Sequence, residues 1–489
     1  MFGTKTIHTF GRVRLKLGRM RRTKIVCTIG PASDSQDMLA RLIAAGMNVA
    51  RLNFSHGTHE YHRALIRRIK QVRRALNKPV AILQDLQGPK IRVGLIGGGT
   101  GFVTLRPGQE FILTTEDIPG DEHRVSVSLK TLPQEVEEGH RILLADGNIE
   151  LVVEKVTGTE VHCRVVVGGT LSSHKGMNLP ASDVRVESLT AKDRADIPVG
   201  LQEGVDAIAL SFVRSAADVA AARAEIKAYG GNVPIIAKIE KSQAVDNIDS
   251  IVQEANAIMV ARGDLGVEID IERVPLVQKM IIRKCNTLGR PVITATQMLQ
   301  RMVDNPRPTR AEATDVANAI LDGTDAVMLS DETAVGKYPS EAVVMMDRIA
   351  RSAEVYLDPH KFENIPIESG TEHAISRASY FVAKEVDAAA IITPTWSGKT
   401  ACLVARFRPR QTILAPTPNE SALDFLSLCW GVIPLPISPS DTIDDMIRYA
   451  IEVGRNAGYL EAGQQVIITG GVPLNVAGKT NFIKVDRVS

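Results

Sequence analysis

The sequence predicts an α/β protein built on a (β/α)8 barrel, with an inserted β-barrel domain and a C-terminal open α/β domain. Eight short apolar, β-branched runs alternate with segments of helical period along the first three quarters of the chain. This rhythm breaks between Leu86 and Ala207, where Gly, Val and Thr are frequent and no long helical period occurs. After about Glu363 a new alternation of apolar runs and helical segments begins.

The eight runs are typical of buried parallel strands. Near-continuous apolar strands that alternate with helices form a parallel sheet covered on its outside, and eight of them close naturally into a TIM barrel. The predicted strands are Lys24 to Gly30, Met47 to Phe54, Val80 to Leu86, Ala207 to Val213, Ile235 to Glu240, Ala257 to Leu265, Pro291 to Leu299 and Ala326 to Glu332.

The helix after the first strand shows how the sequence sets helix ends. Ser33 or Asp34 is expected to cap its start, because a short polar side chain accepts from the free backbone N–H groups there. Gly46 is expected to end it. The helical spacing predicts an apolar face made of Met38, Leu39, Leu42 and Ile43.

The breaks in the pattern predict the domain boundaries. Residues 1–19 precede the first strand as a mobile extension; residues 1–33 lack Asp and Glu, so an organelle transit peptide is the alternative. Residues 20–88 and 187–355 form the barrel, residues 89–186 the inserted β domain, and residues 356–489 the C-terminal domain. The strands expected in the C-terminal domain are Ala390 to Thr393, Thr412 to Ala415, Gly431 to Ile437 and Gln465 to Thr469.

Composition narrows the class of protein. With 489 residues the chain exceeds one ordinary hydrophobic core, and no apolar run approaches the roughly 20 residues of a membrane helix, so a soluble, cytoplasmic protein is expected. The net charge of +2 and the 4% aromatic content argue against nucleic-acid binding. The cysteines, odd in number and never in a C-x-x-C pair, are expected to be reduced, buried thiols: Cys27, Cys163, Cys285, Cys402 and Cys429.

Polar residues end the predicted strands, and in a barrel the carboxyl ends of the strands surround the active site. Lys238 and Glu240 stand two apart and therefore share a face of their strand. Glu240 and Asp264 form a carboxylate pair without His or Cys, which suits Mg²⁺ or Mn²⁺. The other residues at this end are Arg51, Asn53, Ser55, His56, Asp85, Arg262, Thr296, Gln297, Ser330 and Glu332.

This set indicates a site for a phosphorylated or polyanionic substrate, because a hard metal lies among cations such as Arg51 and Lys238. Gly263 permits close backbone approach, so the N–H groups near it are candidates to hold a carboxylate. Each feature has an ordinary alternative when taken alone. Lys238 and Glu240 would form a rim ion pair, Gly263 would be a turn glycine, and Thr296 a plain strand residue.

Nine segments closely resemble, in family order, the signature series of the pyruvate kinases: KIVCTIGPAS, NVARLNFSHG, DLQGPKIR, SHKGMNLP, LTAKD, AKIE, ARGDLG, ATQML and LSDETAVG. The resemblance runs from about residue 22 to the C-terminus. It implies the last step of glycolysis, in which the phosphoryl group of phosphoenolpyruvate passes to ADP to give pyruvate and ATP. It also implies Mg²⁺ as cofactor, with Mn²⁺ as a substitute, and a homotetramer.

The resemblance also implies roles for individual residues. Lys238 would stabilise the transferring phosphoryl group and Arg51 would bind it, while Glu240 and Asp264 would hold the metal. The pyruvate portion would lie against Gly263, Asp264 and Thr296. The proton donor to the enolate stays open between Thr296 and a water relayed through Thr296 or Ser330. On the nucleotide side the matching residues are Asn53, Phe54, Ser55, His56, Arg92 and, in an inserted domain that closes as a lid, Lys175.

The sequence departs from the family pattern near the expected monovalent-cation site. Leu86, Gln87 and Lys90 stand where many members have Thr, Lys and Glu, and Asp331 replaces a common Gly. Leu86 has no side-chain oxygen to offer a cation, and the ammonium of Lys90 brings its own positive charge. K⁺ is therefore not expected to be required. The alternative is that Lys90 is a solvated rim lysine and K⁺ still binds.

The segment TPTWSGKT resembles the family's effector loop, and its hydroxyl groups are candidates to cradle a phosphate. A phosphorylated allosteric effector is therefore expected, with Lys479 and Thr480, next to Gly478, as an opposing loop. The alternative is a well-capped helix start. The candidate effector-binding residues are Thr395, Ser397, Gly398, Lys399 and Thr400.

Two other functions stay open at this point. Another phosphoenolpyruvate or pyruvate barrel, such as an aldolase or a carboxylating enzyme, would share the metal and the ligand type but would not depend on ADP. A catalytically silent regulatory protein on the same fold would be expected to lack Lys238 or one of the metal carboxylates. None of these residues is missing.

Overall fold

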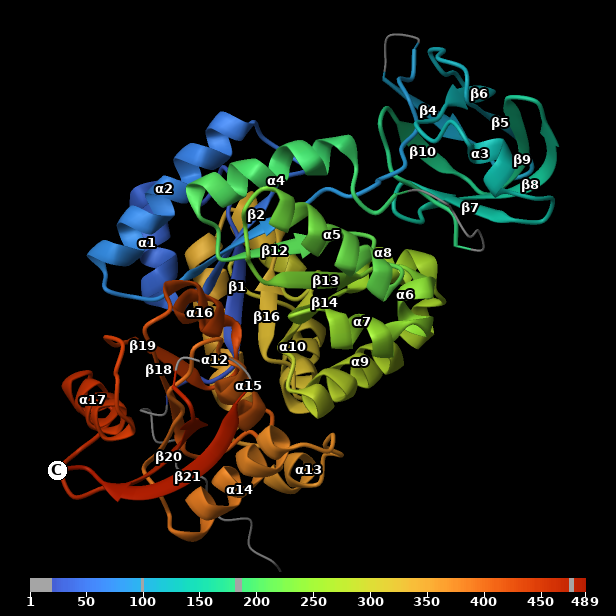
Figure 1. The fold of residues 1–489 in the computed structure, drawn as a ribbon. Helices are drawn as coiled ribbons and strands as arrows, with labels where there is room; N and C mark the ends of the chain where they lie inside the picture. Colours follow the sequence, from blue (N-terminus) through green and yellow to red (C-terminus); the bar gives the residue numbers. More distant parts are fainter. Residues whose placement is uncertain (1–19, 98–100, 181–186, 475–478) are drawn as a thin grey trace, which may run out of the picture.

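The computed structural model describes residues 20–97, 101–180, 187–474 and 479–489. Figure 1 shows a helix-covered barrel, a β domain that projects from it, and an α/β domain packed on its other side. The predicted N-terminal extension, residues 1–19, and Gly478 lie outside the described residues. Within those residues, no helix combines the length and the apolar character that a membrane span needs.

Eight parallel strands close the barrel in the order β1-β16-β15-β14-β13-β12-β3-β2. β1 pairs with β2 on one side and with β16 on the other, which joins the first strand to the last. All eight predicted strands are confirmed, each inside its predicted run. They are β1 (Lys24–Thr28), β2 (Val49–Asn53), β3 (Ala81–Asp85), β12 (Ala207–Leu210), β13 (Ile235–Ile239), β14 (Ala257–Ala261), β15 (Val292–Ala295) and β16 (Ala326–Leu329).

Helices cover the outside of the barrel, where one face of each strand packs against them in a single large apolar cluster. They are α1 (Gln36–Ala45), α2 (His59–Ala75), α4 (Ala191–Glu203), α5 (Ala216–Ala228), α6 (Ser242–Asp246), α7 (Ile248–Glu254), α8 (Arg262–Glu268), α9 (Val274–Leu288), α10 (Arg310–Asp322), α11 (Asp331–Ala334) and α12 (Pro339–Glu354), with the 3-10 turns Ile271–Arg273 and Gln300–Val303.

The start of α1 corrects a sequence prediction. Ser35 caps the helix by accepting from the N–H of Met38, so the cap is neither Ser33 nor Asp34. Ser33 instead bonds to Gly30 in the preceding turn, and Asp34 accepts from the hydroxyl of Tyr61 at 3.1 Å. The three neighbouring polar residues are equivalent in propensity, and the turn geometry selects among them. The predicted helix end at Gly46 is confirmed.

The alternate face of the strands fills the barrel interior with a separate apolar cluster. Phe425 and Leu428 of the C-terminal domain belong to the same cluster. The interior is therefore a packed core, and its amino end is closed by another domain. The inward strand positions in this cluster are Val26, Val49, Ala81, Leu83, Ala207, Ala209, Ile236, Ala257, Met259, Ile293, Ala295, Ala326 and Met328.

The β domain between β3 and α4 consists of a six-stranded sheet, order β11-β7-β8-β9-β5-β6, and a two-stranded sheet, order β10-β4. Both sheets pack on one apolar core. The amide of Asn178 donates to Glu268 of α8 at 2.8 Å, next to the barrel mouth. The elements are β4 (Phe102–Leu105), β5 (Glu110–Thr114), β6 (Arg124–Ser126), α3 (Leu132–Glu135), β7 (Arg141–Leu144), β8 (Ile149–Thr157), β9 (Glu160–Val167), β10 (Gly169–Ser172) and β11 (Met177–Asn178).

The C-terminal domain holds a five-stranded sheet in the order β19-β18-β17-β20-β21. Its four predicted strands are confirmed as β17 to β20, and the sequence analysis missed the antiparallel edge strand β21. The elements are α13 (Pro359–Glu363), α14 (Thr371–Glu385), β17 (Ala390–Ile392), α15 (Lys399–Ala405), β18 (Thr412–Thr417), α16 (Glu420–Phe425), the 3-10 turn Leu426–Leu428, β19 (Val432–Pro436), α17 (Ile443–Asn456), β20 (Gln465–Gly471) and β21 (Thr480–Arg487).

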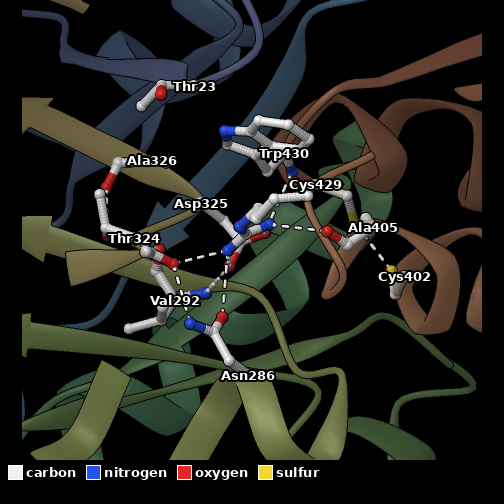
Figure 2. A network of polar contacts seen from close by, with 12 residues as sticks. Thr23, Asn286, Val292, Thr324, Asp325, Ala326, Cys402, Ala405, Cys429 and Trp430 are labelled. Carbon is white, nitrogen blue, oxygen red and sulfur yellow. Dashed lines mark hydrogen bonds and ion pairs between the residues drawn. The ribbon is translucent and has the colours of Figure 1, made fainter. Parts of the chain in front are cut away.

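A buried ion pair joins this domain to the barrel (Figure 2). Arg408, whose side chain is 1% exposed, contacts both carboxylate oxygens of Asp325 at 3.0 and 3.2 Å. The same carboxylate accepts from the backbone N–H groups of Trp430 and Val292, each at 3.1 Å. Asp325 precedes β16 directly, so the pair fixes the C-terminal domain against the amino end of the barrel.

Candidate active site

The interior of the barrel changes from apolar to polar toward the carboxyl ends of its strands. Side chains of a strand alternate between the two faces, so the residue two positions after an inward apolar residue also faces inward. At this next position six strands carry a residue with a polar side chain. These residues are Thr28, Arg51, Asp85, Ser211, Lys238 and Ser330.

Lys238 is the buried cation of this polar layer, with its side chain 11% exposed. Its Nζ lies 2.9 Å from Oε1 of Glu240 and 3.2 Å from Oδ1 of Asp85. It also donates to Oγ of Ser211 at 2.7 Å. Each of the three ammonium N–H groups therefore has an acceptor.

Arg51 supplies a second cation beside Lys238. Its Nε donates to Oδ2 of Asp85 at 2.5 Å, and its Nη1 donates to the hydroxyl of Thr28 at 2.9 Å. Asp85 thus lies between the two cations, one at each carboxylate oxygen. With Glu240, the buried part of the site balances two positive charges against two negative charges.

These charges shift one another's protonation. Burial by itself raises the pKa of Asp85, but Lys238 and Arg51 outweigh it and hold that pKa below its ordinary value. Burial by itself lowers the pKa of Lys238, but Asp85 and Glu240 outweigh it and raise that pKa. Burial raises the pKa of Glu240; Lys238 opposes this rise and Asp264 adds to it. Lys238 is consequently a permanent cation at neutral pH.

Glu240 and Asp264 form an oxygen donor set at the rim of this layer. Oε2 of Glu240 accepts from the backbone N–H of Phe212 at 2.7 Å, which fixes the carboxylate. Asp264, in the first turn of α8, lines the cavity between the barrel mouth and the β domain. The described residues contain no group of three His, Cys, Asp or Glu side chains arranged to hold a metal. A hard divalent cation fits the two carboxylates only if substrate and water oxygens complete its shell.

Thr296 and Gly263 come together from neighbouring strand ends. The hydroxyl of Thr296 accepts from the backbone N–H of Gly263 at 2.8 Å and donates to the carbonyl of Ala295 at 2.7 Å. Thr296 has φ +68°, a costly conformation for a β-branched residue. Arg262 holds this turn by donating to the carbonyl of Thr296 at 2.7 Å, while pairing with Asp315.

Ser330 lies at the end of β16 with its Oγ buried and without a hydrogen-bond partner in the part of the chain that the structure describes. Its backbone N–H donates to Glu332 at 2.7 Å, and the other oxygen of Glu332 accepts from the N–H of Leu299. Glu332 is therefore a structural anchor between two strand ends. Burial raises its pKa.

Four of the predicted nucleotide residues lie at the end of β2 and in the loop that follows it, and their environments differ. The amide oxygen of Asn53 accepts from the N–H of Ser55 at 3.2 Å, and His56 is exposed. Phe54 is buried and stacks on His62 with ring centroids 3.9 Å apart. The backbone of Phe54 is also engaged, since its N–H donates to the carbonyl of Asp85 at 2.9 Å and its carbonyl accepts from Nζ of Lys192 at 2.6 Å.

The other two predicted nucleotide residues lie on the β domain. The backbone of Arg92 forms an antiparallel β-bridge with Gly176, so Arg92 lies beside Lys175. Nη1 of Arg92 donates to the carbonyl of His174 at 2.9 Å. Lys175 is exposed. These residues lie on the projecting domain in Figure 1, whereas the Asn53 loop lies on the barrel.

Lys90 lies in the first connection between the barrel and the β domain. It lines the same cavity as Asp264, together with Met177 of β11 and Phe212. Leu86 is 1% exposed, and its carbonyl accepts from the hydroxyl of Ser211 at 2.7 Å.

The predicted effector residues lie far from this site in sequence, on the C-terminal domain. Thr395, Ser397 and Thr400 line one cavity, and Lys479 and Thr480 line its other side. The hydroxyls of Thr400 and Thr480 are 2.6 Å apart. Two further predicted residues begin α15: Gly398 has φ +83°, and Lys399 pairs with Glu372.

Comparisons with known proteins agree with this architecture. The family models described as pyruvate kinase, barrel domain, and pyruvate kinase, alpha/beta domain, match residues 20–343 and 373–486. Pyruvate kinase 2 of Synechocystis sp. is 48% identical over 471 residues, covering 96% of this chain and 79% of that protein. The pyruvate kinase of Clostridium acetobutylicum is 45% identical over 474 residues, covering 96% of this chain and 100% of that protein. The chain belongs to the pyruvate kinase family.

Two residues of this pyruvate kinase family site escaped the sequence analysis. Thr28 supports Arg51, and Ser211 contacts Lys238. A signal for both was present in the period-two alternation, because Thr28 follows inward Val26 and Ser211 follows inward Ala209 by two positions. Polar residues were predicted at the other six strand ends, and none at the ends of the first and fourth strands.

The charge balance of the site predicts how Asp85 contributes to stability. Asp85→Asn should lower the free energy of unfolding by about 3–5 kcal/mol at pH 7, because Arg51 and Lys238 lose a buried partner. The folded pKa of Asp85 is depressed, so this contribution is present above the ordinary pKa of about 3.9 and is lost as pH falls through the lower folded value. Urea unfolding should show the gap from the natural protein closing below about pH 4.

The matched control is Asp117→Asn, whose carboxylate is fully exposed on the β domain. It should leave the urea midpoint nearly unchanged at both ends of the pH range. A gap for Asp85→Asn that is independent of pH would contradict the depressed pKa.

Proposed function

We propose that this chain transfers the phosphoryl group of phosphoenolpyruvate to ADP, giving pyruvate and ATP, as a pyruvate kinase in glycolysis. The observation that carries the proposal is the buried ammonium of Lys238, held between Asp85 and Glu240 beside Arg51 in a chain of this family. Phosphoryl transfer relies mainly on positioning and electrostatic stabilisation, and fixed cations supply both.

In this proposal Arg51 binds the phosphoryl oxygens, and Lys238, whose three N–H groups have acceptors in this structure, acts on them through its positive charge. Lys238 stabilises the charge that develops in the transition state, because its ammonium is fixed by three acceptors and does not need to reorganise. Arg51 orients the group from the neighbouring side of the barrel. The phosphoryl group then passes from the oxygen of phosphoenolpyruvate to the oxygen of ADP by in-line displacement. This displacement takes place within the charged, enclosed mouth of the barrel.

Glu240 and Asp264 would hold Mg²⁺, for which Mn²⁺ can substitute. When bound, the ion supplies positive charge to the phosphoryl and pyruvate oxygens. The half-buried position of Asp264 at the cavity and the fixed carboxylate of Glu240 support this assignment.

The pyruvate portion would lie against Gly263, Asp264 and Thr296, where a substrate carboxylate accepts from backbone N–H groups. The Thr296 hydroxyl, which accepts from Gly263, would give way to that carboxylate. Protonation of the enolate would pass through Ser330 rather than Thr296. This is supported by the hydroxyl of Ser330, which lacks a partner among the described residues, whereas the hydroxyl of Thr296 already donates to a carbonyl.

The nucleotide would bind between the barrel loop Asn53 to His56 and the β domain, with Arg92 and Lys175 reaching its phosphates. We propose residues 20–88 and 187–355 as the catalytic domain, residues 89–186 as a lid that excludes water, and residues 356–489 as the regulatory domain. The projecting position of the β domain at the barrel mouth supports the lid.

The regulatory cavity of the C-terminal domain would bind a phosphorylated effector. Thr395, Ser397, Thr400 and Lys479 line one cavity, and hydroxyl groups together with a cation are a set that suits a phosphate. We also propose a cytoplasmic homotetramer. An apolar surface cavity between α10 and α12, with Tyr356 72% exposed at its edge, supports association of copies.

K⁺ would not be required for activity. Both oxygens of Asp85 already contact Arg51 and Lys238, and the carbonyl of Leu86 already accepts a hydrogen bond. Lys90 lines the cavity at the barrel mouth and brings its own tethered positive charge there.

Lys238→Met tests the catalytic assignment. Turnover in a coupled assay with phosphoenolpyruvate, ADP and Mg²⁺ should fall on the order of a thousandfold, with a much smaller rise in the apparent substrate constants. The control Lys279→Met removes a lysine of α9 that pairs with Asp322 away from the mouth. Turnover near that of the natural protein in Lys238→Met would refute the assignment, and activity without ADP would refute the function.

Binding of Mn²⁺, measured by paramagnetic relaxation, tests the metal ligands. Glu240→Gln and Asp264→Asn should each weaken binding at least tenfold, since each removes one of two charged ligands. Glu268→Gln is the control, because its carboxylate bonds to Lys241 and Asn178. Unchanged affinity in both test variants would rule out this pair.

Omission of K⁺ tests the role of Lys90. With bulky alkylammonium counterions and saturating substrates, the rate should stay within about threefold of that in KCl, which is under 1 kcal/mol of barrier. Lys90→Glu combined with Leu86→Thr should introduce K⁺ dependence. A tenfold or larger drop for the natural protein would show the proposal to be wrong.

Kinetics with added sugar phosphates and nucleoside monophosphates test the effector site. One of them should lower the phosphoenolpyruvate concentration that gives half-maximal rate. Thr400→Glu should abolish this response through charge repulsion while leaving the basal rate intact. Hyperbolic kinetics with no response to any phosphorylated metabolite would contradict the site.

A further inference from the structure

Ser211 lies between Lys238 and Asp85, the two groups that define the charged centre of the barrel. It follows β12 directly, and its neighbour Leu210 pairs with Ala237, so Ser211 is level with Lys238 on the adjacent strand. On the other side, Ala209 pairs with Asp85 of β3. Ser211 is 1% exposed. Its hydroxyl is therefore enclosed between β3 and β13.

The hydroxyl of Ser211 connects Lys238 to the backbone of β3. It donates to the carbonyl of Leu86 at 2.7 Å and accepts from Nζ of Lys238 at 2.7 Å. A hydroxyl has one proton, and here that proton goes to the carbonyl, because the other acceptor, Oδ1 of Asp85, lies farther away at 3.5 Å. The lone pairs consequently face the ammonium, so Ser211 serves Lys238 only as an acceptor.

We propose that Ser211 is a positioning residue for phosphoryl transfer, which fixes the Lys238 ammonium without neutralising it. This inference rests on the proposed function of Lys238. The carboxylates of Asp85 and Glu240 attract the ammonium strongly, and the hydroxyl oxygen of Ser211, on the β12 side between β13 and β3, gives it an uncharged third contact that limits its approach to them. Because the contacted carbonyl belongs to the main chain, which itself donates from Leu86 to Ala209 at 3.0 Å, the anchor is rigid.

The surroundings leave little room for a substitute. A Cβ on Gly88 would lie 2.9 Å from Cβ of Ser211, so Gly88 lies close against the Ser211 side chain at its Cβ. Removal of the single oxygen of Ser211 frees less space than a water needs. In Ser211→Ala the ammonium would lose one acceptor and move toward Asp85 and Glu240. A displaced charge stabilises the transition state less, while substrate binding through the other contacts continues.

The test compares Ser211→Ala with Ser379→Ala. Ser379 is also fully buried and donates to a backbone carbonyl, Ile375 at 2.8 Å, but it lies on α14 of the C-terminal domain. Ser211→Ala should lower kcat by about 10- to 100-fold, with KM for ADP and phosphoenolpyruvate changed less than about threefold. Ser379→Ala should leave kcat per folded protein unchanged.

A double-mutant cycle with Lys238→Met separates positioning from a general structural effect. If Ser211 acts through Lys238, Ser211→Ala should lower kcat by less than about threefold in the Lys238→Met background. Equal fold losses in the two backgrounds would overturn the inference. So would a kcat for Ser211→Ala equal to that of the natural protein.

A crystal structure of Ser211→Ala provides a readout that does not depend on activity. The Lys238 Nζ should lie closer to the Asp85 and Glu240 carboxylates than in the natural protein, and an unmoved Nζ would overturn the positioning role. Absence of activity in the natural protein would instead refute the proposed function. The crystal structure of Ser211→Ala would then still test whether Ser211 positions the Lys238 ammonium.

Discussion

A lysine ammonium buried at the mouth of a parallel barrel needs compensating charge, because an unpaired charge away from water costs several kcal/mol. Lys238 meets this need with Asp85 and Glu240, and Asp85 in turn carries Arg51. The compensation requires four side chains close together: Lys238 and Glu240 at the end of β13, Asp85 on β3 and Arg51 on β2. Only a closed barrel with fixed register brings the ends of these three strands near one another. The site therefore depends on closure, and closure depends on the apolar interior beneath it.

The lower end of the barrel shows the same dependence on buried charge. Asp325 and Arg408 pair where the C-terminal domain meets the barrel, and Phe425 of that domain completes the interior core. Both contacts join strand β16 and its neighbours to the domain that holds the cavity lined by Thr400 and Lys479. A shift of the C-terminal domain would thus be felt at the base of the strands whose upper ends carry Ser330 and Thr296.

Much of the fold could be predicted from the sequence because period-two and helical patterns are local. The eight strands, the end of α1 at Gly46 and the polar strand ends Lys238, Glu240 and Thr296 were predictable on that basis. The cap at Ser35 was not, since turn geometry chose among three similar residues. The edge strand β21 was missed because its mixed, exposed residues lack the apolar run of a buried strand.

The sequence by itself determined the fold class, the family and the residue types at the mouth, because these follow from short patterns and matching segments. Tertiary structure decided how those residues are used. It buried Phe54 against His62, directed the Thr296 hydroxyl to a carbonyl, and joined Ser211 to Lys238. The contact between Ser211 and Lys238 joins two strands, and its distance depends on strand register and barrel closure, which no local pattern records. The other two contacts join residues close in the chain, but the side-chain directions that allow them are set by the packing around the strand ends.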